Sequence, residues 1–186
     1  MRKLLDAGVS VFETRGYHAA RVDDIVKLAR TSHGTFYLYF SNKEDLFRAL
    51  AQEVGDALQA LAESLPLVGP DGAGRAALAE WIGSFADLYD EYGPVVRAWT
   101  EAEIGTHEFG RLGTEMLTRF TLTFTDRISG SLPDRVNPAI AALALVAMLE
   151  RMNYYVLSKQ VNVSRAKMID TLAGVMHASL YGTTHA

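Results

Sequence analysis

The sequence contains no cysteine, and this absence excludes several kinds of protein chemistry at once. Without thiols there is no disulfide framework, no thiolate nucleophile and no metal site built on thiolate ligands. A chain that needs no disulfides fits a reducing compartment such as the cytosol. With 49% hydrophobic residues, the 186-residue chain is instead expected to bury a sizeable apolar core.

Long apolar runs are also missing. The longest covers residues 138–149, stops at Glu150 and Arg151, and is shorter than the ~20 residues that a membrane-spanning helix needs. The opening residues MRKLLD include two basic side chains but lack the apolar stretch that completes an export signal. The sequence therefore predicts a soluble, cytoplasmic protein without a membrane partner.

No strong excess of one charge is present, because the net charge is only −4. The charges are nevertheless unevenly distributed. Residues 1–50 hold eight basic and six acidic side chains, whereas the remainder holds ten basic and sixteen acidic ones. A change of sign between two parts of a chain indicates different partners for each, and the first part keeps a nucleic-acid partner possible.

Residue patterns typical of catalysis are likewise absent. There is no Ser/His/Asp trio, no phosphate-binding glycine loop and no carboxylate pair at a readable spacing. Glu103 and His107 are four residues apart and could both face a divalent cation, but Gly105 separates them and no third ligand is evident. Solvated side chains are the preferred interpretation. We predict neither an enzyme nor a bound metal or cofactor.

Helical periodicity runs through the whole chain, with no alternating stretches typical of strands, and predicts an all-α fold of about nine helices. Gly16 is expected to stop the first helix, and Gly93 with Pro94 to end the fifth and begin the sixth. Predicted caps are a box of Ser41 with Glu44, Asn137 before the eighth helix and Ser164 before the ninth. We expect a DNA-binding domain over residues 1–48 and a second helical domain over residues 49–186.

The segment TSHGTFYLYF, residues 31–40, follows a short helix and a three-residue turn, as the second helix of a helix-turn-helix does. Its small front would let backbone and hydroxyl groups approach DNA. Phe36 and Phe40 are four residues apart, so they would anchor the helix to its own core. Tyr37 lies off that face and could donate to a phosphate. The alternative is an ordinary amphipathic connector whose rings are all buried.

The stretch FETRGYHAARVDDIVKLARTSHGTFYLYFSNKEDLF resembles the DNA-binding domain of the TetR family of bacterial transcriptional regulators. The resemblance implies a homodimer with a C-terminal helical domain that binds a small molecule. Arg30 stands where the family usually has glycine, so either it adopts positive φ at a cost of about 1 kcal/mol or the turn differs slightly from the usual one. We expect it to gain a phosphate contact. Arg21 replaces the usual capping hydroxyl. The predicted DNA-binding set is Arg21, Arg30, Thr31, Ser32, His33, Gly34, Thr35, Tyr37, Tyr39 and Lys43.

Aromatic residues and methionines recur at helical spacing between residues 81 and 155. Large rings with polar tips can line a ligand cavity, although for each one plain core packing is the commoner role. We expect a hydrophobic or aromatic effector among polar groups such as Asn153, Arg97, Thr100, Glu101 and Glu103, each of which could equally be solvated. The predicted ligand-binding set is Trp81, Phe85, Tyr89, Trp99, Phe109, Met116, Phe120, Phe124, Met148, Met152 and Tyr155.

The last two expected helices suggest a homodimer. The first of them is apolar nearly all round, and the second carries an apolar stripe with small residues that permit close approach. Alternatively, the first of these helices forms the centre of its own subunit. The predicted dimerisation set is Leu143, Ala147, Ile169, Leu172, Ala173, Met176 and Leu180.

Together these features predict a homodimeric, ligand-responsive repressor that grips a palindromic operator in double-stranded DNA and is released by a hydrophobic small molecule. Activation is also possible, because its sign depends on the operator position. The alternatives are a small-molecule carrier without a specific operator, and an all-helical enzyme, which would need a base or metal cluster that the sequence lacks.

Overall fold

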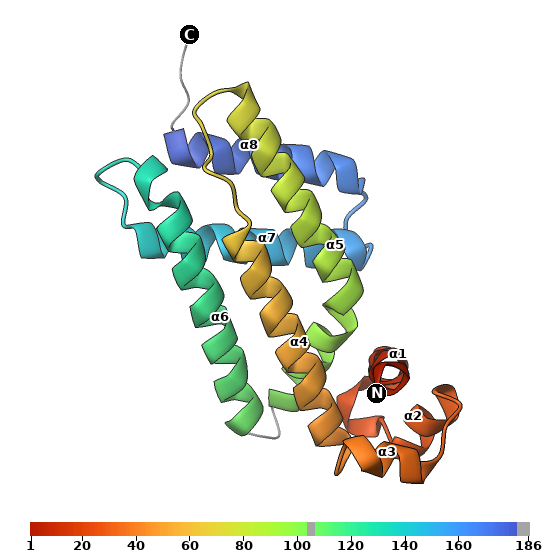
Figure 1. Cartoon of the computed structure of the whole chain (residues 1–186). Helices are drawn as coiled ribbons and strands as arrows, with labels where there is room; N and C mark the ends of the chain where they lie inside the picture. The colour runs from red at the N-terminus through yellow and green to blue at the C-terminus, as the bar shows by residue number, and fades with distance from the viewer. Residues whose placement is uncertain (104–106, 182–186) are drawn as a thin grey trace. The chain divides into compact units, whose positions relative to one another are not determined.

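The computed structural model describes residues 1–103 and 107–181, and every regular element in those ranges is helical (Figure 1). This confirms the all-α class. The elements are α1 (Arg2–Ala19), α2 (Val22–Leu28), α3 (His33–Tyr39), α4 (Lys43–Glu63), α5 (Gly72–Glu103), α6 (His107–Ile128), the short 3-10 helix η1 (Ser129–Ser131), α7 (Pro138–Leu157) and α8 (Arg165–Tyr181).

The predicted break at Gly93 and Pro94 is wrong, because α5 continues through both residues. Within residues 1–103 and 107–181, eight α-helices therefore replace the approximately nine that were expected for the chain. Proline inside a helix removes one backbone hydrogen bond and costs about 3 kcal/mol. Here Gly93 and Pro94 are buried together with Val95 and Ala98, so tertiary packing offsets the local cost. Glycine followed by proline does disfavour a continuous helix, but the packing of α5 outweighs this local preference.

The chain divides into two compact units. Unit 1 comprises Met1–Ala57 and Glu91–Glu115, and unit 2 comprises Leu58–Asp90 and Met116–Ala186. Helices α4, α5 and α6 each contribute residues to both units. The division thus follows spatial packing rather than a single point in the sequence, and the boundary after residue 48 stays a prediction.

Unit 1 has an aromatic core. The ring of Phe47 on α4 contacts the rings of Phe12, Tyr17 and Phe109, with centroid distances of 5.3, 4.9 and 5.1 Å. Gly16 interrupts α1 with φ 74° and ψ 168°, a left-handed conformation that confirms its role as a helix stop. The resulting change of direction places Tyr17 in the core immediately after the helical stretch.

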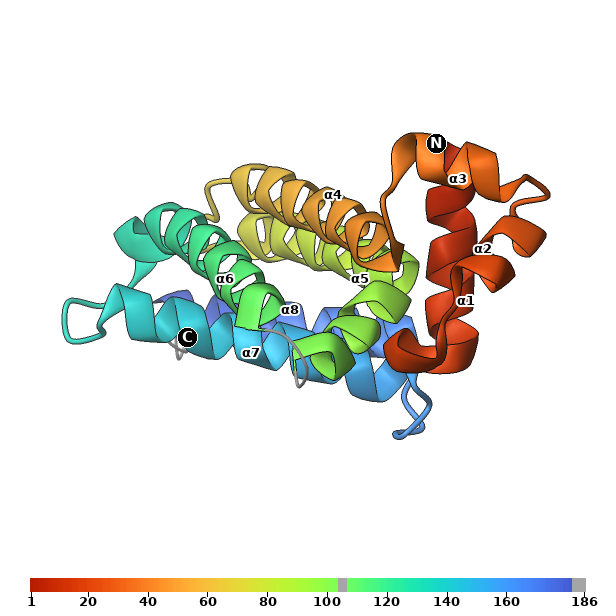
Figure 2. The same cartoon turned by 90° about the horizontal axis from the view of Figure 1, so that it is seen from below.

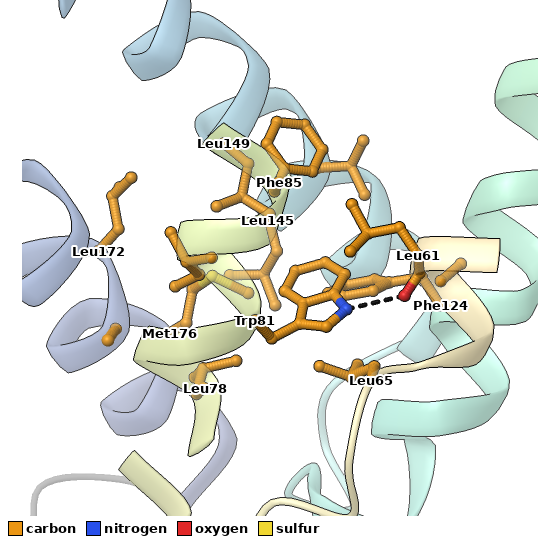
Figure 3. Packing of buried hydrophobic residues seen from close by; sticks show 14 of the residues in the cluster. Leu61, Leu65, Leu78, Trp81, Phe85, Phe124, Leu145, Leu149, Leu172 and Met176 are labelled. Atoms are coloured by element: carbon orange, nitrogen blue, oxygen red, sulfur yellow. Dashed lines mark hydrogen bonds between the residues drawn. The ribbon is translucent and has the colours of Figure 1, made fainter. Parts of the chain in front are cut away.

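Unit 2 is built around Trp81, whose indole Nε1–H donates to the carbonyl of Leu61 at 2.8 Å (Figure 3). The indole stacks on Phe124 of α6 at a centroid distance of 5.5 Å. Leucines of α7 and Met176 of α8 surround this pair. Because the polar tip of the indole is satisfied by backbone, the ring contributes its apolar surface to the core without an unpaired donor.

The helix caps agree with the sequence in two cases and differ in one. Asn137 accepts from the Ile140 N–H at 3.1 Å and Ser164 accepts from the Lys167 N–H at 3.3 Å, as predicted. At α4, however, Asn42 rather than Ser41 is the cap, since its Oδ1 accepts from the Asp45 N–H at 2.8 Å. Asp45 in turn accepts from the Ser41 N–H at 3.0 Å. The capping side chain is therefore shifted by one residue, while the return hydrogen bond still comes from the Ser41 N–H.

Candidate DNA-binding surface

Helices α2 and α3 pack against each other, and α2 also packs on α1, as Figure 2 shows. Phe36 is completely buried and Phe40 is 6% exposed, and the two rings contact each other at a centroid distance of 5.6 Å. These two phenylalanines therefore anchor α3 to its own unit, which confirms that prediction. The opposite side of α3 is left to solvent.

The exposed front of α3 is capped and preorganised by its own residues. The Ser32 Oγ accepts from the Thr35 N–H at 3.1 Å and lies 3.0 Å from the Thr35 hydroxyl. His33 Nε2 lies 2.6 Å from Asp23 Oδ1 of α2, across the turn. Ser32, His33, Gly34 and Thr35 are all exposed. The predicted small front thus forms one continuous surface.

Gly34 is not required by internal packing. A Cβ added there would meet only the Ser32 Oγ, at an ordinary contact distance of 3.7 Å. Glycine in a helix is destabilising by roughly 0.5–1 kcal/mol relative to alanine. The fold therefore gives no reason for a glycine at this position, whereas the close approach of an external molecule to the backbone does.

The turn between α2 and α3 forces a non-glycine residue into the left-handed region. Arg30 has φ 53°, as its place in the turn predicted. The Thr31 N–H donates to the Val26 carbonyl at 3.0 Å and the Arg30 N–H to the Lys27 carbonyl at 3.2 Å, which is the Schellman arrangement. That motif usually places glycine where Arg30 stands. The Arg30 side chain is exposed, while Thr31 is half-buried.

The start of α2 lacks a stabilising side-chain cap. Arg21 occupies the N-cap position, and its side chain makes no cap hydrogen bond. A capping Ser, Thr, Asp or Asn is typically worth about 1 kcal/mol there. Both Arg21 and Arg30 thus stand, exposed, at positions where another residue type would stabilise the local backbone better.

Lys43 requires a correction. Its Nζ donates to the carbonyls of Tyr17, His18 and Ala20 at 2.8, 3.2 and 3.2 Å. A lysine ammonium has three donors, so all of them are used inside the protein rather than on a phosphate. The ammonium also lies 4.8 Å from the centre of the Tyr17 ring. Lys43 therefore ties the end of α1 to the start of α4.

Tyr17 shares this local network. Its hydroxyl donates to Glu44 Oε1 at 3.4 Å, and its ring is buried among other aromatic residues. Burial, reinforced by the nearby Glu44 carboxylate, raises the pKa of Tyr17 to about 12. Tyr17 therefore stays a neutral donor at any physiological pH.

Three side chains near the end of α3 project into solvent. Tyr37, Leu38 and Tyr39 are 57%, 75% and 48% exposed. The two tyrosines were predicted DNA-facing residues. Leu38 was missed, although its position two residues from both Phe36 and Phe40 was enough to remove it from their buried face. A large apolar residue on the exposed face of such a short helix is the signal that would have found it.

A short helix that is anchored by two phenylalanines, has a small polar front and follows a second short helix and a tight turn defines a helix-turn-helix DNA-binding fold. The sequence signature for bacterial regulatory proteins of the tetR family matches residues 4–50. Residues 4–50 thus carry the DNA-binding domain of bacterial regulatory proteins of the tetR family, and the resemblance predicted from the sequence is confirmed.

Known proteins extend the similarity beyond this motif. The HTH-type transcriptional regulator EthR of Mycolicibacterium smegmatis is 28% identical over 190 residues, covering 97% of this chain and 85% of EthR. The fatty acid metabolism regulator protein of Bacillus subtilis is 39% identical over 64 residues, covering 34% and 33% of the two chains. Both relatives are regulators rather than enzymes.

Solved structures share the fold over nearly the whole chain. A transcriptional regulator FadR from Bacillus subtilis, in complex with stearoyl-CoA, superimposes with a TM-score of 0.72 at 19% identity, covering 97% of this chain and 98% of FadR. A TetR-family regulator from a Rhodococcus species gives a TM-score of 0.76 at 18% identity, covering 96% and 97%. At these identities the likeness establishes the fold alone.

The predicted ligand-binding residues are only partly gathered in one place. Trp81, Phe85, Tyr89, Phe120 and Phe124 are buried side by side in the core of unit 2, and Met148 and Met152 pack at its edge. Met116 is half-buried in the same unit and Tyr155 is exposed on α7. The side chains of Trp99, Arg97, Thr100, Glu101, Glu103 and His107 lie outside the described residues.

Phe109 does not join this set. It belongs to unit 1, where its ring contacts Phe47 at 5.1 Å and Tyr17 at 5.8 Å. Its burial is thus explained by the core under the helix-turn-helix. The sequence stripe on α6 was continuous, but its first member packs in a different unit from Phe120 and Phe124.

Asn153 on α7 is fully buried. Its Nδ2–H donates to the Leu149 carbonyl at 2.8 Å, but its Oδ1 accepts no hydrogen bond from the described residues. The amide orientation is fixed by the Leu149 carbonyl, since the reverse orientation would oppose two oxygens. Tyr89 of α5 donates to the neighbouring Glu150 at 3.2 Å. A buried acceptor without a partner costs about 1–3 kcal/mol, so Asn153 is a candidate contact for a ligand.

The predicted dimerisation residues divide between two environments. Leu143 and Ala147 are exposed on α7, and Ile169 is half-buried. Leu172, Ala173, Met176 and Leu180 are instead buried in the core of their own chain. The α8 stripe faces inward because it covers Trp81 and the α7 leucines, so these four side chains have no surface left for a second subunit.

The apolar surface that remains is on α7 itself. Ile140 is 69% exposed and Leu143 51% exposed. By length and composition α7 could cross a membrane, a test that the central helix of a soluble protein also passes. About a third of the apolar stretch of α7 is buried within the chain, so a large share of the apolar surface of this helix is exposed.

Proposed function

We propose that this protein is a homodimeric, ligand-responsive repressor that binds a palindromic operator by inserting α3 into the major groove. The observation that carries the proposal is the two-sided character of α3, with Phe36 and Phe40 buried and Ser32, Gly34 and Thr35 exposed. In a helix-turn-helix this front contacts base edges, and two-fold related copies lie about 34 Å apart on one face of DNA. Arg21, Arg30, His33, Tyr37 and Tyr39 would contact the adjacent phosphates.

The experiment that tests this proposal is selection of DNA from a random pool by the purified protein. We expect an enriched inverted repeat with half-sites separated by about one helical turn. Binding should weaken steeply with salt, since each neutralised phosphate releases counterions. A protein that enriches no sequence at any salt concentration would instead be a small-molecule carrier.

Homodimerisation through the exposed faces of α7 and α8 is supported by the uncovered apolar surface of Ile140 and Leu143, and by small residues such as Ala147 that permit close approach. Replacing Leu143 by glutamate should convert a dimer into a monomer in sedimentation measurements. The matched control is Leu122→Glu on α6, which changes a leucine that is at least as exposed as Leu143. A wild-type chain that sediments as a monomer contradicts this part of the proposal.

The effector is proposed to be a largely apolar molecule that binds within unit 2 and carries an N–H or O–H group for Asn153. The aromatic core supports the apolar part, and the unpaired Oδ1 supports the donor. The FadR neighbour contains stearoyl-CoA, a ligand with a long apolar chain. An effector must bind the DNA-releasing form more tightly than the DNA-bound form, because only differential affinity shifts the balance.

A compound screen with the selected operator tests the effector. Compounds that release the protein from DNA should share an apolar body and a hydrogen-bond donor. Asn153→Leu should retain operator binding while losing the response to these compounds. Asn162→Leu in the exposed segment between α7 and α8 is the matched control. An Asn153→Leu variant that responds as wild type does would exclude this contact.

A further inference from the structure

Leu38 is the most exposed large apolar side chain of the helix-turn-helix, at 75%. Its neighbours explain why the fold does not use it. The anchoring side of α3 is already filled by Phe36 and Phe40, and Leu38 is two residues from each. In a helix, residues two apart face in different directions, so Leu38 cannot join the core without turning the anchors out.

The face that Leu38 shares is the small polar front. Gly34 lies four residues earlier and Thr35 three residues earlier, so all three belong to one side of α3. Helical side chains lean toward the N-terminus of their helix, so Leu38 leans toward the end of this face that holds Gly34. Gly34 has no side chain, and an added Cβ would contact only the Ser32 Oγ, so Leu38 supplies the apolar body of a front otherwise made of backbone and polar groups.

The chemistry of the major groove limits what such a side chain can read. Adenine, guanine and cytosine present hydrogen-bond donors or acceptors there, whereas thymine also presents its C5 methyl group. Leucine can neither donate nor accept a hydrogen bond. Its only sequence-dependent partner among base edges is therefore the thymine methyl. Contact with a deoxyribose would add affinity without sequence preference.

We propose that Leu38 is a specificity-determining residue that selects thymine in each half-site by packing on its C5 methyl group. The proposal rests on the DNA-binding function proposed above. It adds a base preference to a surface whose remaining groups are hydroxyls, an imidazole and bare backbone.

The test removes one symmetry-related pair of methyl groups at a time from the operator. In the selected operator, each thymine is replaced by deoxyuridine at symmetric positions of both half-sites, which deletes the methyl and keeps the base pair. At one position we expect wild-type affinity to fall about fourfold per half-site, the factor associated with one buried methylene-sized group. Leu38→Ala should bind the methylated and unmethylated operators equally.

Two further variants make the result decisive. Leu67→Ala changes an exposed leucine in the segment between α4 and α5 and should keep the full methyl dependence of wild type. Leu38→Met keeps an apolar side chain and should keep part of the dependence of affinity on the thymine methyl groups. This variant can be measured even if Leu38→Ala binds the operator too weakly. Thermal unfolding of Leu38→Ala should match wild type, because an exposed side chain contributes little to the core.

The possible failures are distinguishable. If the wild-type protein selects no operator, the proposed DNA-binding function fails. If it selects an operator but Leu38→Ala and Leu38→Met show the same methyl dependence as wild type at every thymine, only the role of Leu38 is overturned. An operator that is insensitive to every deoxyuridine replacement overturns it equally.

Discussion

The exposed side of α3 and the core of unit 2 are both rich in aromatic rings, but the rings stand in opposite environments. Tyr37 and Tyr39 are about half exposed, whereas Trp81 and Phe124 are buried and stacked on each other. Internal packing fully accounts for the second pair and leaves the first pair unexplained. The comparison teaches that a ring indicates an external partner only when the fold itself has no use for it.

Glycines repeat the same contrast. A Cβ at Gly8 of α1 would lie 2.5 Å from Leu46 Cδ2, so this glycine permits the close packing of α1 on α4. A Cβ at Gly34 would meet almost nothing. One glycine is explained from inside the protein and the other only from outside. The predictions below exploit this division between residues that serve the fold and residues that serve a partner.

The largest effect is expected from removing an anchor of α3. Phe36→Ala should lower the free energy of unfolding by about 3–5 kcal/mol, because it leaves a large cavity in the core of unit 1. Tyr37→Phe, one residue along, should leave the unfolding free energy nearly unchanged and weaken operator binding. Urea denaturation and operator titration measure the two quantities. Equal destabilisation by both variants would show that the rings of α3 are not divided in this way.

Lys43 offers a sharper form of the comparison, because a phosphate contact and an internal role predict different outcomes. Lys43→Met should lower the free energy of unfolding by about 2 kcal/mol, since three carbonyls at the end of α1 lose a charged donor. Lys27→Met on exposed α2 surface is the control. If Lys43→Met has wild-type stability but a reduced salt dependence of DNA binding, the original prediction that Lys43 contacts DNA would be supported instead.

Arg30 should trade stability against binding. Arg30→Gly relieves the left-handed backbone, and we expect a gain in unfolding free energy of about 1 kcal/mol. The same change should reduce the slope of log affinity against log salt by about 1 if the guanidinium neutralises one phosphate. Lys159→Gly is a matched control, because Lys159 has φ 56° after α7, outside the helix-turn-helix. It should gain similar stability and leave the salt slope unchanged.

Gly34→Ala should stabilise the free protein by about 0.5–1 kcal/mol while weakening operator binding, because the added methyl fits the fold but blocks close approach to DNA. Gly8→Ala makes the same chemical change and should destabilise instead, since Leu46 would have to move within a filled core. Circular dichroism melts and operator titrations distinguish the two. Undiminished operator affinity of Gly34→Ala would remove the argument for close approach.

How much of this could be predicted from sequence depends on how local the cause is. The helix-turn-helix, its anchors, the left-handed Arg30 and the uncapped α2 were predicted, because motif spacing and backbone conformation act within a few residues. The role of Lys43 was not, because its carbonyl partners lie 23 to 26 residues earlier. The helix break predicted at Pro94 was wrong for a related reason, since packing against distant residues outweighs the local tendency of proline to end a helix.

Periodicity identifies a buried face but not what covers it. The α8 stripe containing Leu172 and Met176 was correctly expected to be buried, yet it packs on Trp81 and α7 of the same chain rather than being free for a second subunit. Phe109 and Phe124 share a stripe on α6 and belong to different units. Leu38 was overlooked, although its spacing of two residues from Phe36 and from Phe40 already removed it from their buried face.

The smallest expected effect concerns the cap that joins α3 to α4. Hydrogen bonds from the Ser41 hydroxyl and N–H, with the ion pair to Arg48, lower the pKa of Asp45 below its ordinary value of 3.8. A lowered folded-state pKa means that the ionised group stabilises the protein above pH 3.8 and that this contribution is lost as the pH falls through the folded-state pKa.

Asp45→Asn should therefore show a smaller loss of unfolding free energy than wild type between pH 4 and pH 2, with Ser41→Ala intermediate because it removes one of the hydrogen bonds. Because the pair is exposed, 0.5 M salt should reduce the difference. If the unfolding free energies of wild type and Asp45→Asn change in parallel down to pH 2, ionisation of Asp45 does not stabilise the start of α4.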